Sequence, residues 1–129
     1  MFTVQQIQNA HLKVKSGSDF PSYIKEIKSF GVLGFKTWVT NSVTEYFGAN
    51  NFTTNSLPKY ESLVISDVCN PTTFIQNLKA HQKGETDYYT FCTHCAETGI
   101  EYWIVDLNKM TCTYYNKSQQ EVLVEKIPE

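Results

Sequence analysis

The stretch TDYYTFCTHCAETGIEYWIVDLNKMTCTYY, residues 86–115, decides the fold that this sequence predicts. It opens with Thr86-Asp87, residue types that favour a helix start, and continues with apolar residues at helical spacing. Gly99 can end that helix in the left-handed conformation. The segments IEYWIVDL and TCTYY then alternate as strands on either side of a turn at Asn108-Lys109. The stretch therefore predicts one helix that leads directly into a β-hairpin.

An earlier stretch repeats this pattern. Residues 18–47, SDFPSYIKEIKSFGVLGFKTWVTNSVTEYF, align with residues 86–115 without a gap when the chain is shifted by 68 positions. The matching pairs include Asp19 and Asp87, Gly31 and Gly99, and Tyr46 and Tyr114. A helix that ends at Gly31 and a hairpin formed by residues 32–40 and 43–47 are therefore predicted. The gap-free register indicates an internal duplication.

Two further helices are predicted from their capping signals. Thr3 with Gln6 fits a capping box, so a first helix is expected over about residues 3–15, with Ser16-Gly17 after it. Asn70-Pro71 places an N-cap residue before a proline at the first helical position and predicts a third helix to about Lys83. Each half of the chain thus begins with a helix pair.

Two more strands complete the expected fold. Residues 60–65, within YESLVISD, predict a strand that closes the first half, and EVLVEKI, residues 121–127, predicts the last strand. The predicted class is α+β: a helix-helix-hairpin-strand unit occurs twice, in pseudo-repeats over about residues 3–66 and 71–127 of one domain, 1–129. Each unit alone buries little, so the two hairpins are expected to join or abut in an antiparallel sheet with four helices on one face. The strand order does not follow from the sequence.

Length, charge and the N-terminus exclude several classes of protein. With 129 residues, 41% of them hydrophobic, the chain is long enough for one core. A net charge of −2 offers no basic field for a phosphate backbone, so no nucleic acid is expected as a partner. The sequence shows no signal-peptide pattern and no run of about 18 apolar residues, so we expect a cytoplasmic protein without a membrane span. Its four cysteines are then expected as thiols or metal ligands, not disulfides.

The sharpest chemical motif is Cys92-Thr93-His94-Cys95, which Cys112 follows. A redox site favours a cysteine at a helix N-terminus, whereas Cys92 lies more than a turn inside the predicted helix. A zinc site needs further ligands, for which Cys112 with Cys69 or His81 are the candidates. The repeat favours a third reading, because Cys92 and Cys95 take the places of the core residues Ile24 and Ile27. We therefore expect buried structural thiols, no cofactor and no catalytic residue.

The aromatic residues of the hairpins predict a surface. Alternation places one set of side chains on one sheet face: Phe35, Val39, Tyr46, Trp103, Val105, Leu107 and Tyr114. The opposite face receives Trp38, Phe47, Tyr102, Ile104 and Tyr115. If the helices cover the first face, Trp38, Tyr102, Ile104 and Tyr115 form a candidate surface for a partner or ligand. The alternative is that the final strand and the loop 48–59 cover these residues.

The segments DFPSYIKEIKSFGV, EYFGAN, TDYYTFCTHCAETGIEYWIVDL and KMTCTYY resemble a family of about this length. Its members are YdfO-like, prophage-associated and labelled phage envelope proteins. The resemblance implies no activity and supplies no catalytic residues. The expected function is a small non-catalytic binding or assembly module, whose partner is a protein, a small ligand or a second copy in a homodimer. The alternative is a thiol- or zinc-dependent protein centred on Cys92, Cys95 and Cys112.

Overall fold

The structure, a computed structural model, describes residues 1–14 and 19–128. In the first half of the chain, the elements are α1 (Val4–His11), α2 (Phe20–Ser29), β1 (Gly34–Trp38), β2 (Thr44–Phe47), the 3-10 helix η2 (Ala49–Asn51) and β3 (Thr53–Asn55). In the second half, they are α3 (Pro71–Gln82), α4 (Tyr88–Glu97), β4 (Ile100–Asp106), β5 (Thr111–Asn116) and β6 (Glu121–Lys126). The predicted α+β class is confirmed.

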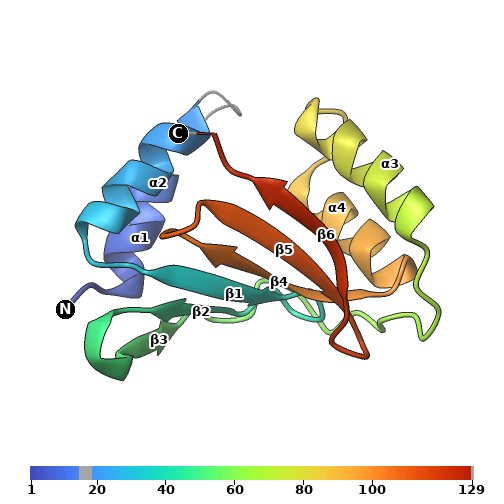
Figure 1. The fold of residues 1–129 in the computed structure, drawn as a ribbon, viewed down its shortest axis with the longest axis horizontal. Helices are drawn as coiled ribbons and strands as arrows, with labels where there is room; N and C mark the ends of the chain where they lie inside the picture. Colours follow the sequence, from blue (N-terminus) through green and yellow to red (C-terminus); the bar gives the residue numbers. More distant parts are fainter. Residues whose placement is uncertain (15–18, 129) are drawn as a thin grey trace.

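The six strands form one antiparallel sheet in the order β3-β2-β1-β4-β5-β6 (Figure 1). The two predicted hairpins, β1–β2 and β4–β5, join through the pairing of β1 with β4 at the centre of the sheet. In that pair Phe35 lies opposite Val105 and Trp38 lies opposite Tyr102. The strand order is symmetrical about the central pair β1–β4. That an internal duplication produced this symmetry stays a prediction.

Local side-chain chemistry explains where the helices begin. The backbone N–H of Gln6 donates to the Thr3 hydroxyl over 3.2 Å, and the Thr3 N–H donates to the Gln6 side chain over 2.8 Å, which completes a capping box. The Asn70 side chain accepts from the N–H of Thr73 at the start of α3. α1 ends at His11, and the predicted stop at Ser16-Gly17 lies outside the described residues.

Glycines with positive φ release the chain from α2 and α4, as the sequence predicts. The φ angle is 100° at Gly31 and 86° at Gly99, a conformation that glycine adopts without a steric penalty. Gly99 also allows a close approach. A Cβ at this position would lie 2.8 Å from the Cα of Cys69 and 2.8 Å from the carbonyl oxygen of Val68. The segment before α3 is therefore packed directly against the junction of α4 and β4.

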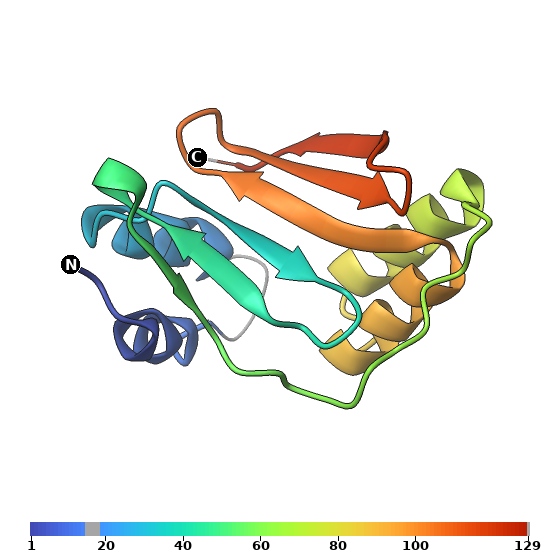
Figure 2. The same cartoon turned by 90° about the horizontal axis from the view of Figure 1, so that it is seen from below.

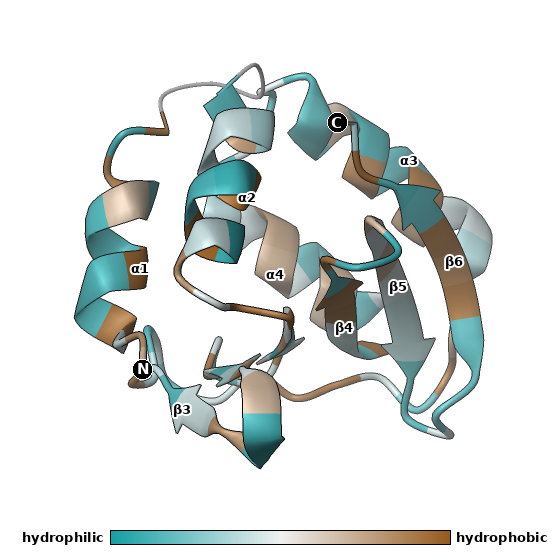
Figure 3. Cartoon of the chain, turned by 60° about the vertical axis from the view of Figure 1, so that its left-hand side comes forward, coloured by the Kyte–Doolittle hydropathy of each residue, from teal (hydrophilic) through white to brown (hydrophobic). Residues whose placement is uncertain are grey.

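The helices form two pairs near opposite ends of the sheet, α1 with α2 and α3 with α4 (Figures 1 and 2). Their apolar sides face the sheet, and hydrophilic and hydrophobic residues share each helix (Figure 3). On the helix-facing side of the sheet, the Tyr114 ring lies 5.0 Å from that of Phe74 on α3, and the Trp103 ring lies 5.9 Å from that of Phe91 on α4. The predicted core face is thus confirmed, because Trp103, Val105 and Tyr114 are buried beneath helices.

The strand predicted at residues 60–65 is wrong. The backbone N–H groups of Lys59 and Leu63 donate to the carbonyls of Asn41 and Thr40 in the β1–β2 turn, over 2.9 and 2.7 Å, so this segment bonds to a turn and forms no ladder. The edge of β2 is taken by β3, which follows it after only a short connection. A short loop closes at a smaller entropic cost than a longer one, which favours this nearer partner.

None of the helices in the described ranges is long and apolar enough to cross a membrane. α1 has 8 residues and α3 has 12.

Candidate functional site

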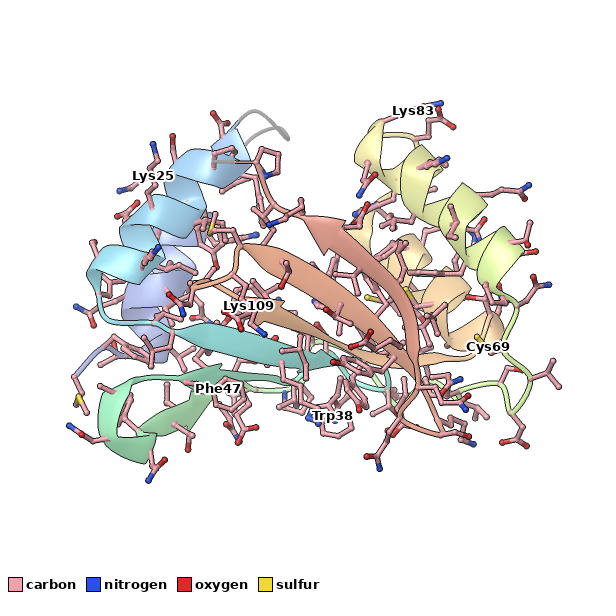
Figure 4. All side chains as sticks on the ribbon, in the orientation of Figure 1. Lys25, Trp38, Phe47, Cys69, Lys83 and Lys109 are labelled. Carbon is pink, nitrogen blue, oxygen red and sulfur yellow. The ribbon has the colours of Figure 1, made fainter. Side chains whose placement is uncertain are left out.

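The sheet has a second side, here called the outer face, which carries Lys36, Trp38, Phe47, Tyr102, Ile104 and Tyr115. The strand register places these residues together, because Trp38 lies opposite Tyr102, Tyr102 lies opposite Tyr115, and Lys36 lies opposite Ile104. Figure 4 shows Trp38 and Phe47 on the side of β1 away from Lys25 on α2 and Lys83 at the end of α3. The four predicted surface residues are therefore neighbours on three adjacent strands.

The alternative was that the final strand and the loop 48–59 cover this face; the final strand and residues 53–55 of that loop lie at the edges of the sheet. β6 pairs with β5 at one edge of the sheet, and β3 pairs with β2 at the other. Both segments extend the sheet sideways. The outer face keeps Trp38, Ile104 and Tyr115 partly exposed.

Three rings on the outer face, here called the aromatic row, stand side by side across the strands. The Trp38 and Tyr102 ring centroids are 5.1 Å apart at 56°, and those of Tyr102 and Tyr115 are 4.8 Å apart at 22°. Tyr102, in the middle, is only 7% exposed. Tyr102 is therefore buried within the row, where the sequence interpretation expects an exposed side chain: one face of its ring stacks on Tyr115, and the Trp38 ring lies tilted toward it. Such ring pairs stabilise the sheet by about 0.5–1.5 kcal/mol each beyond their burial.

Lys36 lies against the aromatic row, a contact that the sequence interpretation did not predict. Its Nζ lies 4.0 Å from the ring centroid of Trp38 and 4.1 Å from that of Tyr102. These distances fit a cation–π contact with both rings. The signal was present in the sequence, since Lys36 and Trp38 are two residues apart on a strand and so share a face.

Two carboxylates, those of Glu101 and Glu121, affect the pKa values of the tyrosines in the row. The pKa of Tyr102 is raised by burial, by Tyr115 and by the negative charge of Glu101. The pKa of Tyr115 is raised by burial and then by the charge of Glu121. The carboxylates of Glu101 and Glu121 thus contribute to the raised pKa of these two hydroxyls, after burial.

The cysteines of α4 lie in the core, as the repeat predicts. Cys92 and Cys95 have no exposed surface, like Ile24 and Ile27 at the equivalent positions of α2. Burial raises the pKa of both thiols, and it raises the pKa of Cys112 on β5 to about 12. A raised pKa reduces the thiolate fraction, and the thiolate is the form that attacks a substrate or binds a metal.

Cys92 has polar neighbours that the sequence did not reveal. The Tyr60 hydroxyl donates to the Val39 carbonyl oxygen. Burial raises the pKa of the Cys92 thiol, and the nearby hydroxyls of Tyr60 and Tyr88 oppose part of that rise. The Tyr88 hydroxyl also lies 2.6 Å from the hydroxyl of Ser42, a fully buried residue with a φ of 63° in the β1–β2 turn. Residues from three separate segments meet here, and the sequence does not reveal that Ser42 and Tyr60 join Tyr88 and Cys92 of α4.

The remaining zinc candidates are occupied by other contacts. The ring of His81 stacks on Phe91 with 4.5 Å between centroids, and its Nδ1 lies 3.1 Å from the Thr86 carbonyl oxygen. Cys69 lies before α3, against Gly99. Over residues 1–14 and 19–128, no group of three or more His, Cys, Asp or Glu side chains is arranged to hold a metal ion.

The described surface has small hollows away from both candidate sites. One of about 160 Å³ is lined by Pro21, Ile24, Lys25, Lys28 and Met110. Another of about 180 Å³ lies between α1 and α2. Neither of these two hollows is lined by a residue of the aromatic row or by Cys92.

Comparison with known proteins places this arrangement in a family. A family model described as "Protein of unknown function (DUF1398)" matches residues 8–126. The chain belongs to this family. The match begins within α1 and includes α2, α3, α4 and all strands of the sheet, so the resemblance seen in the sequence is confirmed for a family of unknown function. The YdfO-like and prophage labels stay predictions. No curated protein matches the chain.

Proposed function

We propose that this DUF1398 chain is a small non-catalytic binding or assembly module that acts through the outer face of its sheet. One observation carries the proposal: the aromatic row lies on the face opposite the helices, with Trp38, Tyr115 and the neighbouring Ile104 partly exposed. Aromatic side chains are enriched where protein surfaces meet partners, because each buries a large area with few rotatable bonds.

Exposure favours this surface over the thiol alternative. Trp38 and Tyr115 reach solvent, whereas Cys92 and Cys95 have no exposed surface and Cys112 is partly buried. A partner can therefore contact the aromatic row without any rearrangement of the core. Access to the thiols of α4 would require the helix to separate from the sheet.

The proposed partners are a second copy of the chain, another protein, or a small ligand. Two outer faces can pack against each other as the inner faces of a β-sandwich do, about 10 Å apart. The net charge of −2 argues against nucleic acid as the partner. A mobile-element origin, as the sequence resemblance implies, belongs to the same proposal.

The assembly part of the proposal is tested with a charge on the row and a matched control. Trp38→Glu places a carboxylate on the outer face, and Val64→Glu places one on an apolar residue that is 89% exposed in the segment between β3 and α3. Sedimentation velocity over a range of concentrations should show reversible dimers for the wild type and for Val64→Glu, and monomers for Trp38→Glu. Circular dichroism should show that all three proteins are folded.

Two results would count against the proposal. Loss of the folded signal in Trp38→Glu would mean that the outer face is part of the core. Dimers that survive Trp38→Glu would place the contact elsewhere. A wild type that stays monomeric at all concentrations removes the homodimer, and the ligand measurement described next then decides whether the outer face binds anything.

A further inference from the structure

We propose that Trp38 and Tyr102 form an aromatic cage for a methylated ammonium group, and that Lys36 fills this cage when no ligand is bound. The inference rests on the proposed function, because it names the ligand chemistry of the same outer face. It starts from the position of the Lys36 Nζ, which is almost equidistant from the two ring centroids, at 4.0 and 4.1 Å.

The contacts of Lys36 indicate which kind of cation the cage suits. Among the described residues, Lys36 lies opposite Glu45 and Ile104 but makes no ion pair and no side-chain hydrogen bond, and its Nζ contacts the rings of Trp38 and Tyr102. A primary ammonium has three N–H donors, which here are left to water. A trimethylated ammonium has no N–H to satisfy and loses less hydration on entering. The ring faces therefore suit a methylated ammonium better than the lysine they hold.

The rigidity of the cage supports the same ligand class. Tyr102 is fixed between Trp38 and Tyr115, with ring centroids 5.1 and 4.8 Å away, so its face is already oriented before a ligand arrives. The side chain that must move is Lys36, whose stem is flexible and which is anchored only at the rings.

Displacement of Lys36 weakens the apparent affinity, because only the molecules with an empty cage can bind. Lys36→Ala empties the cage permanently. We expect this variant to bind tetramethylammonium about tenfold more tightly than the wild type, as one lysine cation–π contact no longer competes. Lys126→Ala is the matched control, since it removes a lysine from the same face, opposite Thr111, without opening the cage.

Binding is measured from the indole N–H resonances of Trp38 and Trp103 by NMR, assigned with Trp38→Phe. Tetramethylammonium chloride is titrated against sodium chloride at equal ionic strength, and against 3,3-dimethylbutan-1-ol, the neutral isostere of choline. The Trp38 resonance should shift only with the ammonium, most steeply in Lys36→Ala, while Trp103 stays unchanged because it is on the buried face. Choline and a peptide with trimethyl-lysine then distinguish a free small molecule from a modified chain as the source.

Equal affinities for the wild type, Lys36→Ala and Lys126→Ala would overturn the cage. An equal response to the neutral alcohol would overturn the ammonium class, because it would show simple apolar contact. If the cage fails while Trp38→Glu still abolishes dimers, the proposed binding face stands without this ligand. If the Trp38 resonance responds while the wild type is monomeric, the face binds a small ligand and does not assemble.

Discussion

Gly99 offers the sharpest test of how the second half of the chain is held together. Its φ of 86° disfavours any residue with a Cβ, and a Cβ there would lie 2.8 Å from both the Cα of Cys69 and the carbonyl oxygen of Val68. The segment it touches is fixed to the end of α4, because the N–H of Asn70 donates to the Thr98 carbonyl over 2.9 Å. Gly99→Ala must therefore displace backbone, not a movable side-chain end.

Gly84 provides the control for the conformational part of this cost. Its φ is 82°, and a Cβ there would meet nothing within 4 Å. An alanine in the left-handed region costs about 1–2 kcal/mol, of which about 0.4–1 kcal/mol is offset because alanine also restricts the unfolded chain. Gly84→Ala should thus lower the free energy of unfolding by about 1 kcal/mol. Gly99→Ala should add the cost of steric displacement, about 1–3 kcal/mol.

Urea unfolding followed by circular dichroism measures both variants on the same scale. For a chain of this size, each kcal/mol corresponds to roughly 4 °C in Tm, so Gly99→Ala should melt about 4–12 °C below Gly84→Ala. If the free energies of unfolding of the two variants differ by less than about 0.5 kcal/mol, the reasoning is refuted, because ordinary surface substitutions change stability by that much. It would mean that the segment before α3 yields without cost and does not secure the junction of α4 and β4.

Three further predictions follow from the cysteines and from the cap of α4. Alanine at both Cys92 and Cys95 should cost about 1–3 kcal/mol in total through cavity formation, whereas valine at both should be nearly tolerated, as denaturant titration will show. Native protein should react slowly with an aromatic disulfide reagent and contain no zinc by elemental analysis, and close to one zinc per chain would replace the structural reading with a metal site. The hydroxyl and backbone N–H of Thr90 hold the pKa of Asp87 below its ordinary value of 3.8. Because the folded pKa is the lower one, the stability that Asp87 adds over Asp87→Asn should be constant above pH 3.8 and shrink as the pH falls below it, in melting curves between pH 2 and 7.

Much of the fold could be read from the sequence because its signals are local. The capping box at Thr3 and the caps at Asn70 and Asp87 involve residues three apart, and each one begins a helix where predicted. Alternation along residues 102–106 and 111–115 assigns side chains to one of two faces, because the side-chain period of a strand is two. It fails at Ile100, which is buried in the core beyond a register shift before Tyr102. The burial of the Cys92 and Cys95 thiols could be predicted because the repeat aligns them with the core residues Ile24 and Ile27.

The strand at residues 60–65 shows where local pattern stops being sufficient. Its alternation suits a strand, but the hydrogen-bond partners of a strand lie elsewhere in the chain, and β3 takes the edge of β2 instead. The pairing of β1 with β4 was undetermined for the same reason. Each hairpin has two edge strands, and the sequence does not say which edge of one hairpin pairs with which edge of the other.

By itself, the sequence determined the helix starts, the glycine stops after α2, α3 and α4, the two hairpins, the α+β class and most of the division of residues between the two sheet faces. Only the tertiary structure decided that the hairpins join through β1 and β4, that Lys36 lies against Trp38 and Tyr102, that Tyr102 is buried within its row, and that Tyr60 lies close to Cys92. The physical reason is range. A cap or a turn is stabilised by atoms a few residues apart, whereas a cross-strand cage is formed by side chains that the register of distant strands brings within about 5 Å.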